Sequence, residues 1–467
     1  VIGYSSTCRG LGDVYKRQVL SLVTSALFAA GLATVNAEIT EEEAARLGKD
    51  LTPLGGEMAG NADGTIPKYE GGITKPLPGF KPGDHHPDPF AEDEVLFTIT
   101  AANADQYAAK LTDGHKALLA QYPDTYKMPV YPTRRSAAVP KFREDAVRNS
   151  SFDVKLVNDG NGVNMMTAGI PYPIPKNGLE VIWNHLFRYR GVTGLRKVGQ
   201  VAPTRSGKYT VVQLEENWLW KFQYTGEQVT KDNNVFVYFE QRITSPARLA
   251  GTILMVHETV DQVVQPRKAW VYNTGQRRVR RAPNVAYDNP GTAADGLRTA
   301  DQLDLFNGSP DRYEWKLLGK KEMYVPYNSY KLHSDKLKIS DIIKPLHINQ
   351  EHTRYELHRV WVVDATLKPG KRHIYKKRRF YFDEDSWSAL VVDQYDNQDR
   401  MWRVSEAHCI NYYDLPAINS TLDVHTDILS GRYLAHGLDN ENEMYDFEYQ
   451  TKSSDYTPAA LRRRGRR

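Results

Sequence analysis

The chain has 467 residues, of which 40% are hydrophobic, 11% aromatic and 25% charged. This composition excludes a disordered or collagen-like chain and supplies enough apolar residues for a large core. The net charge of +4 comes from the two ends, because residues 38–460 carry 53 basic and 56 acidic side chains. The body is therefore not expected to bind nucleic acid through its charge.

An apolar run at 19–32 follows two basic residues and precedes Val35-Asn36-Ala37. The run has the length of a secretory signal core and is too short to span a bilayer. We expect residues 1–37 to be a leader of doubtful origin followed by a signal peptide cut after Ala37, which predicts a periplasmic protein that could associate with the outer membrane. A buried core helix is the alternative for this run. No later run approaches the about 20 apolar residues of a membrane helix, so the mature chain is expected to lack a transmembrane segment.

The mature chain begins with Thr40-Glu41-Glu42-Glu43, a capping box that predicts a short helix. Residues 52–89 are rich in Gly, Pro and Asp and have little periodicity, so 38–90 is predicted to be an extended N-terminal arm. His85-His86 lies in this arm between acidic residues and prolines. An exposed turn is the favoured interpretation of this pair over a metal site.

Residues 91–460 are predicted to form one domain. A strand at 92–100 is followed by helices at 102–122 and 179–189, in which apolar residues recur at helical spacing. Runs rich in β-branched and aromatic residues then predict strands at 209–224, 235–244, 252–264, 268–273 and 321–326. Thr299 and Ser340 are expected to cap brief helices near 303–306 and 341–343.

The clearest region is 355–410, which predicts four long strands joined by short polar connections. Such short connections force neighbouring strands to be antiparallel. A long antiparallel sheet curls and leaves a hollow on its concave side. The predicted fold is therefore mainly β, of the α+β type: a large curved antiparallel sheet, or half-barrel, whose concave face is plugged by the helices at 102–122 and 179–189, filled by a ligand, or shared by both.

Aromatic residues on these elements are either ordinary core or the lining of a ligand site. Trp218 and Trp220 are two residues apart, so both point to one face of a strand. Arg277-Arg278-Val279-Arg280-Arg281 is either a solvated edge strand or a strand whose alternate arginines meet an anionic group. The ligand-binding residues that we predict are Trp183, Trp218, Trp220, Trp270, Trp361, Trp402, Tyr355, Arg278 and Arg280. Residues 461–467 are expected to be a flexible basic tail.

Motifs of known enzyme chemistry are not found. There is no Gly-rich phosphate loop before a helix, no nucleophile elbow and no zinc-type spacing, so no catalytic residue, cofactor or metal is predicted. Asp383 and Asp385 lie in a predicted hairpin turn and are expected to be exposed. Cys409 is expected to be a small buried side chain. For an uncharacterised hydrolase, His185 and His257 are the histidines that would have to be inspected.

Four groups of motifs stand out: Gly169-Ile170-Pro171-Tyr172-Pro173-Ile174-Pro175 with Trp183-Asn184-His185 and Arg188-Tyr189-Arg190-Gly191; Gly275-Gln276-Arg277-Arg278-Val279-Arg280-Arg281-Ala282-Pro283 with Tyr287-Asp288; Val360-Trp361-Val362-Val363-Asp364-Ala365-Thr366-Leu367 with His373-Ile374-Tyr375; and Thr52-Pro53 with Gly60-Asn61-Ala62-Asp63-Gly64-Thr65-Ile66-Pro67. From about residue 38 to its end, the chain thereby resembles the bacterial secreted family catalogued as domain of unknown function 1329. That family is similar to the outer-membrane lipoprotein carrier and receptor proteins of the Lol type. The resemblance implies a curved antiparallel sheet, plugged by helices, that takes up acyl chains. It also implies exporter-like or barrel-like partners in the envelope, because members are often encoded near such proteins.

The leading hypothesis is a non-enzymatic periplasmic carrier of a lipid-like or other hydrophobic ligand, serving an envelope export system. The alternative is an accessory protein that docks to an exporter or an outer-membrane barrel without a ligand of its own. The alternative predicts an aromatic face already filled by the chain's own helices.

Overall fold

The structure is a computed structural model that describes residues 39–221, 227–282, 285 and 287–466. The expected leader, the signal peptide and its cleavage after Ala37 lie outside the described residues. Contacts group the described residues into one unit. The division of that unit into an arm at 38–90 and a domain at 91–460 stays a prediction. In the described residues, no helix combines the length and the apolar character that crossing a membrane requires.

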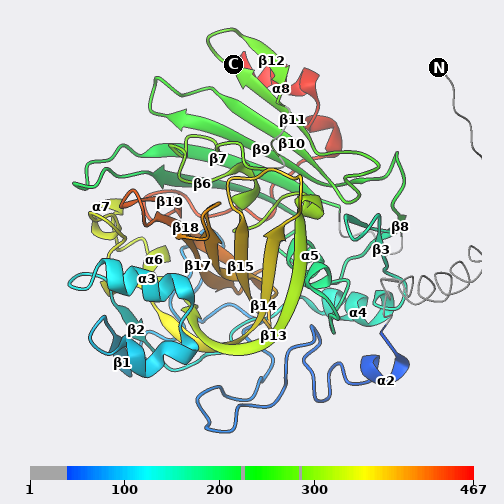
Figure 1. Cartoon of the computed structure of the whole chain (residues 1–467). Coiled ribbons are helices and arrows are strands. Elements are labelled where there is room, and N and C mark those ends of the chain that lie inside the picture. The colour runs from blue at the N-terminus through cyan, green and yellow to red at the C-terminus, as the bar shows by residue number, and fades with distance from the viewer. Residues whose placement is uncertain (1–38, 222–226, 283–284, 286, 467) are drawn as a thin grey trace, which may run out of the picture. The chain divides into compact units, whose positions relative to one another are not determined.

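A 15-stranded sheet forms the main part of the fold (Figure 1). Its strands are β1 (Phe97–Ile99), β2 (Met128–Val130), β6 (Thr193–Val201), β7 (Val212–Trp220), β9 (Val235–Ser245), β10 (Ile253–Thr259), β11 (Lys268–Asn273), β12 (Arg278–Arg281), β13 (Tyr313–Pro326), β14 (Tyr355–Leu367), β15 (Lys377–Asp383), β16 (Ala389–Tyr395), β17 (Met401–Tyr412), β18 (Ala417–Asp427) and β19 (Arg432–Leu438). Hydrogen bonds connect them in the order β1-β2-β14-β15-β16-β17-β18-β19-β6-β7-β9-β10-β11-β12, and β13 pairs with β14. The sheet is open, since the path runs from β1 to β12 without closing. The mainly β fold with a large antiparallel sheet is confirmed.

Smaller elements surround this sheet. Two short pairs are β3 (Leu156–Val157) with β4 (Gly162–Val163) and β5 (Met165–Met166) with β8 (Glu227–Gln228). The α-helices are α2 (Glu41–Ala44), α3 (Asp113–Gln121), α4 (Lys141–Ser150), α5 (Gly178–Phe187), α6 (Tyr330–His333), α7 (Ile339–Ile342) and α8 (Pro458–Gly465). The 3-10 helices are η1 (Ala104–Lys110), η2 (Ala300–Gln302), η3 (Pro310–Arg312), η4 (Gln350–His352) and η5 (Ser453–Asp455).

Local capping explains where the helices begin. The predicted capping box at Thr40 is present and starts α2. The helix expected at 102–122 is interrupted, because the Thr112 hydroxyl accepts a hydrogen bond from the backbone N–H of His115 and begins a new helix, α3. The helix expected at 179–189 is confirmed as α5, which the Asn177 side chain caps. At Thr299 the predicted cap is present, but the helix it starts is η2 rather than one at 303–306.

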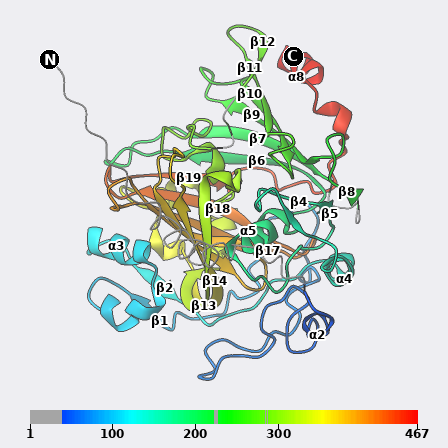
Figure 2. The same ribbon diagram turned by 45° about the vertical axis from the view of Figure 1, so that its right-hand side comes forward.

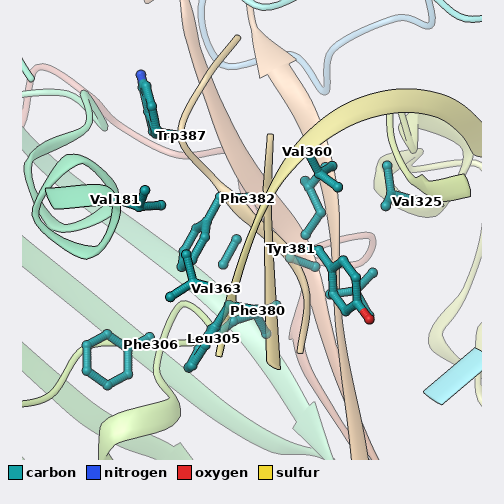
Figure 3. Close-up of a cluster of buried hydrophobic side chains, with 14 of the residues drawn as sticks. Val181, Leu305, Phe306, Val325, Val360, Val363, Phe380, Tyr381, Phe382 and Trp387 are labelled. Atoms are coloured by element: carbon teal, nitrogen blue, oxygen red, sulfur yellow. The ribbon is translucent and has the colours of Figure 1, made fainter. Parts of the chain in front are cut away.

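One half of the sheet is packed by the chain itself. Helix α5 contacts β13 and β14, and α3 contacts β16 and β17. Val181 of α5 and the buried Trp387 belong with Phe380 and Phe382 to the largest cluster of buried hydrophobic side chains (Figure 3). Helix α5 packs on the face that carries Val363 and Phe380, as predicted for a plugged sheet. Helix α3 packs on the opposite face, against Val404 and Glu406, so the expectation that the 102–122 segment plugs the same face is wrong.

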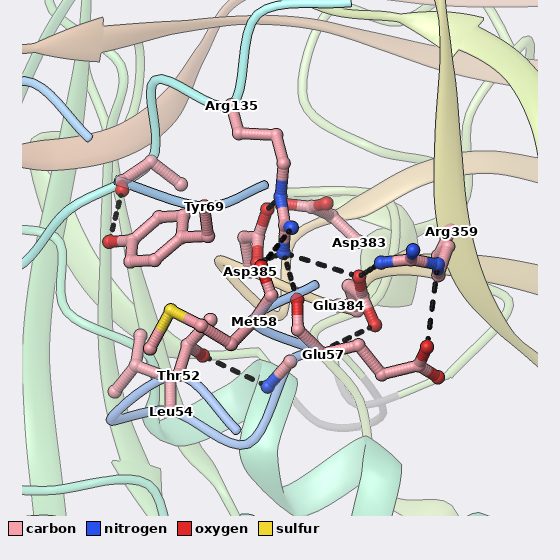
Figure 4. A network of polar contacts seen from close by, with 12 residues as sticks. Thr52, Leu54, Glu57, Met58, Tyr69, Arg135, Arg359, Asp383, Glu384 and Asp385 are labelled. Atoms are coloured by element: carbon pink, nitrogen blue, oxygen red, sulfur yellow. Dashed lines mark hydrogen bonds and ion pairs between the residues drawn. The ribbon is translucent and has the colours of Figure 1, made fainter. Parts of the chain in front are cut away.

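The turn between β15 and β16 is buried, so the expectation of exposed acids at Asp383 and Asp385 is wrong. The side chains of both are almost fully buried. Arg135 donates two hydrogen bonds to the Asp385 carboxylate, at 2.8 and 2.6 Å, and a further one to the carbonyl of Glu57 at 2.7 Å (Figure 4). The arm covers this turn, and Arg135 supplies the counter-charge that lets Asp385 stay buried, whereas Asp383 accepts hydrogen bonds from Tyr327 and Ser386.

The arm is also fixed at His86, which is buried rather than in the expected exposed turn. The His86 ring lies 2.7 Å from the Asp414 carboxylate, and its backbone N–H donates to the His333 ring at 3.1 Å. A long arm with little secondary structure is thus held by side chains of the body.

The C-terminal basic run is not the expected flexible tail. Residues 458–465 form α8, which contacts β10, β11 and β12 (Figure 2). The Thr457 hydroxyl caps this helix, Leu461 is fully buried, and Arg464 forms an ion pair with Glu240. The prediction of a flexible tail considered only the charge of the arginines. It overlooked the helix-start signal before them, which is an N-cap threonine followed by a proline in the first turn.

Candidate ligand-binding site

The β6–β10 half of the sheet differs from the packed half. Side chains alternate along a strand, so β7, β9 and β10 each present every second residue to one face. In register, Trp218 lies opposite Phe239, which in turn lies opposite Val256. The face consists of Glu216, Trp218 and Trp220 from β7, Val237, Phe239 and Gln241 from β9, and Leu254, Val256 and Glu258 from β10.

Two adjoining cavities lie on this face. The aromatic cavity, lined by Trp218, Trp220 and Val237 among others, has an empty volume of about 730 Å³ that includes its open mouth. The arginine cavity, lined by Leu254 and Arg298 among others, has about 500 Å³. The two cavities share the lining residues Phe239, Glu258, Leu303 and Asn307.

The lining of the aromatic cavity requires a strongly curved sheet. Asp423 of β18 and Glu258 of β10 both line it, although four other strands lie between β18 and β10 in the sheet order. In a flat sheet, five strand spacings would separate them by about 24 Å. The sheet therefore bends around this cavity, which lies on its concave side.

A glycine makes room for one wall of the cavity. Gly194 of β6 pairs with Trp218, and a Cβ atom at residue 194 would lie 2.2 Å from the indole ring. The indole of Trp218 thus lies directly over the backbone of β6. Its Nε1–H is buried and has no hydrogen-bond partner in the described part of the chain. The result is a flat apolar wall beside the cavity.

Charged residues at the inner end of the aromatic cavity are paired. The Arg196 guanidinium donates to Glu216 at 2.6 Å, and the Gln241 amide donates to the other carboxylate oxygen at 2.5 Å. Burial alone would raise the pKa of Glu216, but Arg196, His436 and Gln241 together lower it to about 2. Glu216 is therefore an ionised, fully bonded group rather than an acid available for proton transfer.

Three further ion pairs hold the loop that lies over the cavities. Asp304 accepts hydrogen bonds from Arg188 and Arg190, and the Arg190 guanidinium lies 4.3 Å from the centroid of the Trp220 ring. This position allows a cation–π interaction with an aromatic side chain of the cavity. Glu258 pairs with Arg267 at 2.5 Å and accepts a hydrogen bond from the Asn307 amide at 3.2 Å.

The structure brings together two of the sequence-predicted site residues. Trp218 and Trp220 share a face and line the aromatic cavity, as their spacing predicts. Arg278 and Arg280 are exposed on β12, the last strand of the sheet, which agrees with the solvated-edge alternative.

The other predicted aromatic residues are placed outside the two cavities. Trp183 is buried in α5 and donates to the carbonyl of Gly160, and the buried Tyr355 donates to Glu406. Trp361 stacks on Trp387, with ring centroids 6.1 Å apart. The remaining two lie next to polar groups, Trp270 beside the His257 ring and Trp402 with its N–H on Asp427.

Sequence reasoning missed Phe239 and Arg298. The sequence could have indicated Phe239, because this residue shares one face of the strand predicted at 235–244 with Val237 and Gln241. That Phe239 lies beside Trp218 follows only from the register between β7 and β9, which are distant segments of the sequence. Arg298 lies in a loop before η2, where neither spacing nor composition marks it.

The two histidines considered for hydrolysis are held by carbonyl groups. The His185 ring contacts the carbonyls of Trp387 and Phe306 at 3.1 and 3.0 Å, and burial together with Arg188 lowers its pKa to about 3. His257 lies 2.7 Å from the carbonyl of Tyr456. Cys409 is buried as expected, and burial raises the pKa of its thiol. Within the described ranges, no three His, Cys, Asp or Glu side chains are grouped to hold a metal ion.

Comparison with known proteins gives a family and partial structural likenesses. Residues 98–462 match the family described as protein of unknown function (DUF1329). A Pseudomonas aeruginosa protein described as uncharacterized protein PA3922 is 53% identical over 452 residues, which cover 96% of this chain and 99% of the relative.

Two solved structures overlap with part of the chain. A candidate outer membrane lipoprotein-sorting protein domain from Vibrio parahaemolyticus is 13% identical and has a TM-score of 0.42, covering 61% of this chain and 98% of that domain. The LolA superfamily protein NE2245 from Nitrosomonas europaea is 12% identical with a TM-score of 0.37, covering 61% of this chain and 98% of that protein. Lol-type proteins are thus among the structural neighbours, as the sequence resemblance implied. Because these overlaps are partial, the function has to be argued from the geometry of this chain.

Proposed function

We propose that this chain, which belongs to the family described as protein of unknown function (DUF1329), is a periplasmic, non-enzymatic carrier that binds a lipid-like or other hydrophobic ligand. The ligand would lie in the aromatic cavity, and the carrier would serve an export system of the cell envelope. Fractionation of cells tests the location: the proposal expects the protein in the periplasm with Glu38 as its first residue.

The aromatic wall on an open cavity is the observation that supports this proposal. Trp218, Trp220 and Phe239 border an open cavity, and ligand sites are typically concave and lined by apolar and aromatic side chains with a few polar groups. Covering apolar surface with a ligand contributes about 25 cal/mol for each Å² removed from water. A hydrophobic molecule that covers this wall can therefore gain affinity from the apolar surface it removes from water.

Three of the four carboxylates that line the aromatic cavity support binding rather than catalysis, and the fourth is Asp423. Glu216, Glu258 and Asp304 are each hydrogen-bonded to an arginine. A general acid or base needs a proton to exchange with a substrate at working pH. Carboxylates fixed in ion pairs are suited instead to holding the strands and the loop around the cavity.

The packed half of the sheet keeps the docking alternative open. Around β13–β17 the aromatic side chains are covered by α5 and Trp387, as a protein without a ligand would require. The alternative would place the partner on the outer surface of the molecule. The cavities at β6–β10 favour the carrier, because a docking protein gains nothing from an unfilled aromatic hollow.

Titration with the neutral fluorescent probe N-phenyl-1-naphthylamine tests the proposal. Wild-type protein is expected to bind the probe, and Trp220→Ala is expected to weaken binding by about tenfold, because the substitution removes apolar wall from the cavity. Trp270→Ala is the matched control, since Trp270 is also a half-buried tryptophan of the same sheet but lies on β11, outside both cavities. Absence of binding by the wild type, or equal effects of the two variants, would contradict the carrier.

A further inference from the structure

One arginine of the arginine cavity has no hydrogen-bond or ion-pair partner among the described residues. The Arg298 side chain is 4% exposed, and in the described part of the chain it makes neither a hydrogen bond nor an ion pair within 4.0 Å. Its guanidinium lies against Gly291, where a Cβ atom would be only 3.2 to 3.3 Å away. The side chain is thus packed in a fixed position at the wall of the cavity with its hydrogen-bond donors unused.

The neighbouring arginines of the site, unlike Arg298, each form an ion pair with a carboxylate. Arg190 pairs with Asp304, Arg196 with Glu216, and Arg267 with Glu258. A buried charge without a partner is unfavourable, because it has lost its hydration and gained no counter-charge. The charges of Asp423 and Glu216 reach Arg298, but neither carboxylate is close enough to form an ion pair with it. An anion in the arginine cavity would supply the missing counter-charge.

We propose that the ligand is an amphiphile with a single anionic head group, a carboxylate or a phosphate, which pairs with Arg298 while its apolar chain lies in the aromatic cavity. This inference rests on the proposed carrier function and specifies the class of ligand. The forked donors of a guanidinium match both head groups. Phe239 lines both cavities, so one molecule can extend from Arg298 across Phe239 to Trp218.

The charges set the direction in which such a molecule lies. Of the described acids that line the aromatic cavity, Glu216, Glu258 and Asp304 are paired with arginines and Asp423 is not. At a pH above about 6, the charge of Asp423 would repel an anionic head group there. In the arginine cavity, Glu258 is neutralised by Arg267, which leaves Arg298 as an unbalanced positive charge. The head group therefore belongs in the arginine cavity and the chain in the aromatic one.

Calorimetric titration with probes of equal chain length tests this inference. Dodecanoate, dodecyl phosphate and neutral dodecanol are compared below their micelle concentrations, with acetate and inorganic phosphate as head groups without a chain. At least one of the two anions is expected to bind about tenfold or more tightly than dodecanol, because a hydrogen bond to a charged group typically strengthens binding by about this factor. The stronger of the two anions identifies the head group.

Variants of Arg298 separate its role from a structural one. Arg298→Met is expected to remove the preference for the anion while leaving dodecanol binding unchanged, and Arg298→Lys is expected to restore part of the preference. Arg280→Met, on the exposed strand β12, is the control and should behave as the wild type. Because Arg298 has no partner to lose, Arg298→Met is expected to unfold at the same temperature as the wild type or a higher one.

Four results would overturn the inference. Equal binding of dodecanol and both anions by the wild type would rule out a site for the head group, but it would not contradict the proposed carrier of hydrophobic ligands. An anion preference that persists in Arg298→Met would place the head group elsewhere. Binding of inorganic phosphate as tight as that of dodecyl phosphate would indicate a site for a free anion. If none of the chain-bearing probes binds, the proposed carrier function fails as well.

Discussion

Asp423 is a buried acid that lines the aromatic cavity, and its surroundings change its chemistry. Burial raises its pKa from an ordinary value of 3.8 to about 6, and the nearby charge of Asp304 acts in the same direction. One of its carboxylate oxygens is buried without a hydrogen-bond partner in the described chain. At any pH between about 4 and 6, the folded protein therefore holds this side chain protonated to a greater extent than the unfolded chain does.

This preference predicts how stability depends on pH. A group whose pKa is higher in the folded state stabilises the fold below its unfolded pKa, and that contribution is lost as the pH rises through 6. Asp423→Asn imitates the protonated acid. It is expected to be more stable than the wild type at pH 8, by up to about 3 kcal/mol, and equally stable near pH 4.

Urea unfolding at the two pH values measures the difference. Asp105→Asn, at an exposed acid of η1, is the control and should change little at either pH. A loss of stability in Asp423→Asn at pH 8 would contradict the assignment of Asp423 as an acid that is destabilising when ionised.

At the scale of single residues, the sequence predicts pairs on one strand but not partners across strands. The two-residue spacing of Trp218 and Trp220 was sufficient to place them on one face. The contact of Trp218 with Gly194 and its register with Phe239 depend on strand pairing between distant segments. The missing partner of Arg298 depends on the position of every surrounding side chain, so it could be found only in three dimensions.

At the scale of elements, the N-terminal arm is held by one buried ion-pair network. Arg135 reaches both Asp385 at the β15–β16 turn and the backbone of the arm at Glu57. Breaking a buried ion pair by removing one partner typically costs 3–5 kcal/mol, because the other charge stays buried. This network therefore couples the arm to the fold.

Arg135→Met is expected to lower the free energy of unfolding by about 3–5 kcal/mol and to expose the arm to protease between residues 52 and 90. The neighbouring Arg134 gives a matched control, because its side chain is 46% exposed and pairs with Asp93 at the surface. Arg134→Met should cost at most about 1 kcal/mol. Limited proteolysis and urea unfolding of both variants measure the effects, and similar losses in the two would contradict a special role of Arg135.

Strands were predicted where both the residue pattern and the turns were regular. The four strands β14–β17 were found because their connections are short. Strands β6, β18 and β19 were missed. In β18, buried polar residues such as Asp423 and His425 take positions that the recognised strands fill with β-branched or aromatic residues, so the run lacks the composition that marked those strands. Buried polar residues of this kind are stabilised by tertiary partners that a sequence does not reveal.

At the scale of the whole unit, the predicted curved sheet divides into two parts with different interiors. Helix α5 and Trp387 fill the concave side at β13–β17, whereas cavities remain at β6–β10. The sequence predicted that helices and a ligand could share the hollow. It could not predict which half each would occupy, because that depends on the sheet order, in which β6 follows β19.

The central claim is that a guest molecule lies against β7, β9 and β10, and photolabelling tests it most directly. A neutral long-chain alcohol with a diazirine at its chain end is bound, activated by light and located by peptide mapping. The label is expected within residues 212–220, 235–245 and 303–307, and excess dodecanol should prevent it. Labelling confined to α8, the arm or β13–β17, or labelling that dodecanol does not reduce, would contradict a ligand site on this half of the sheet.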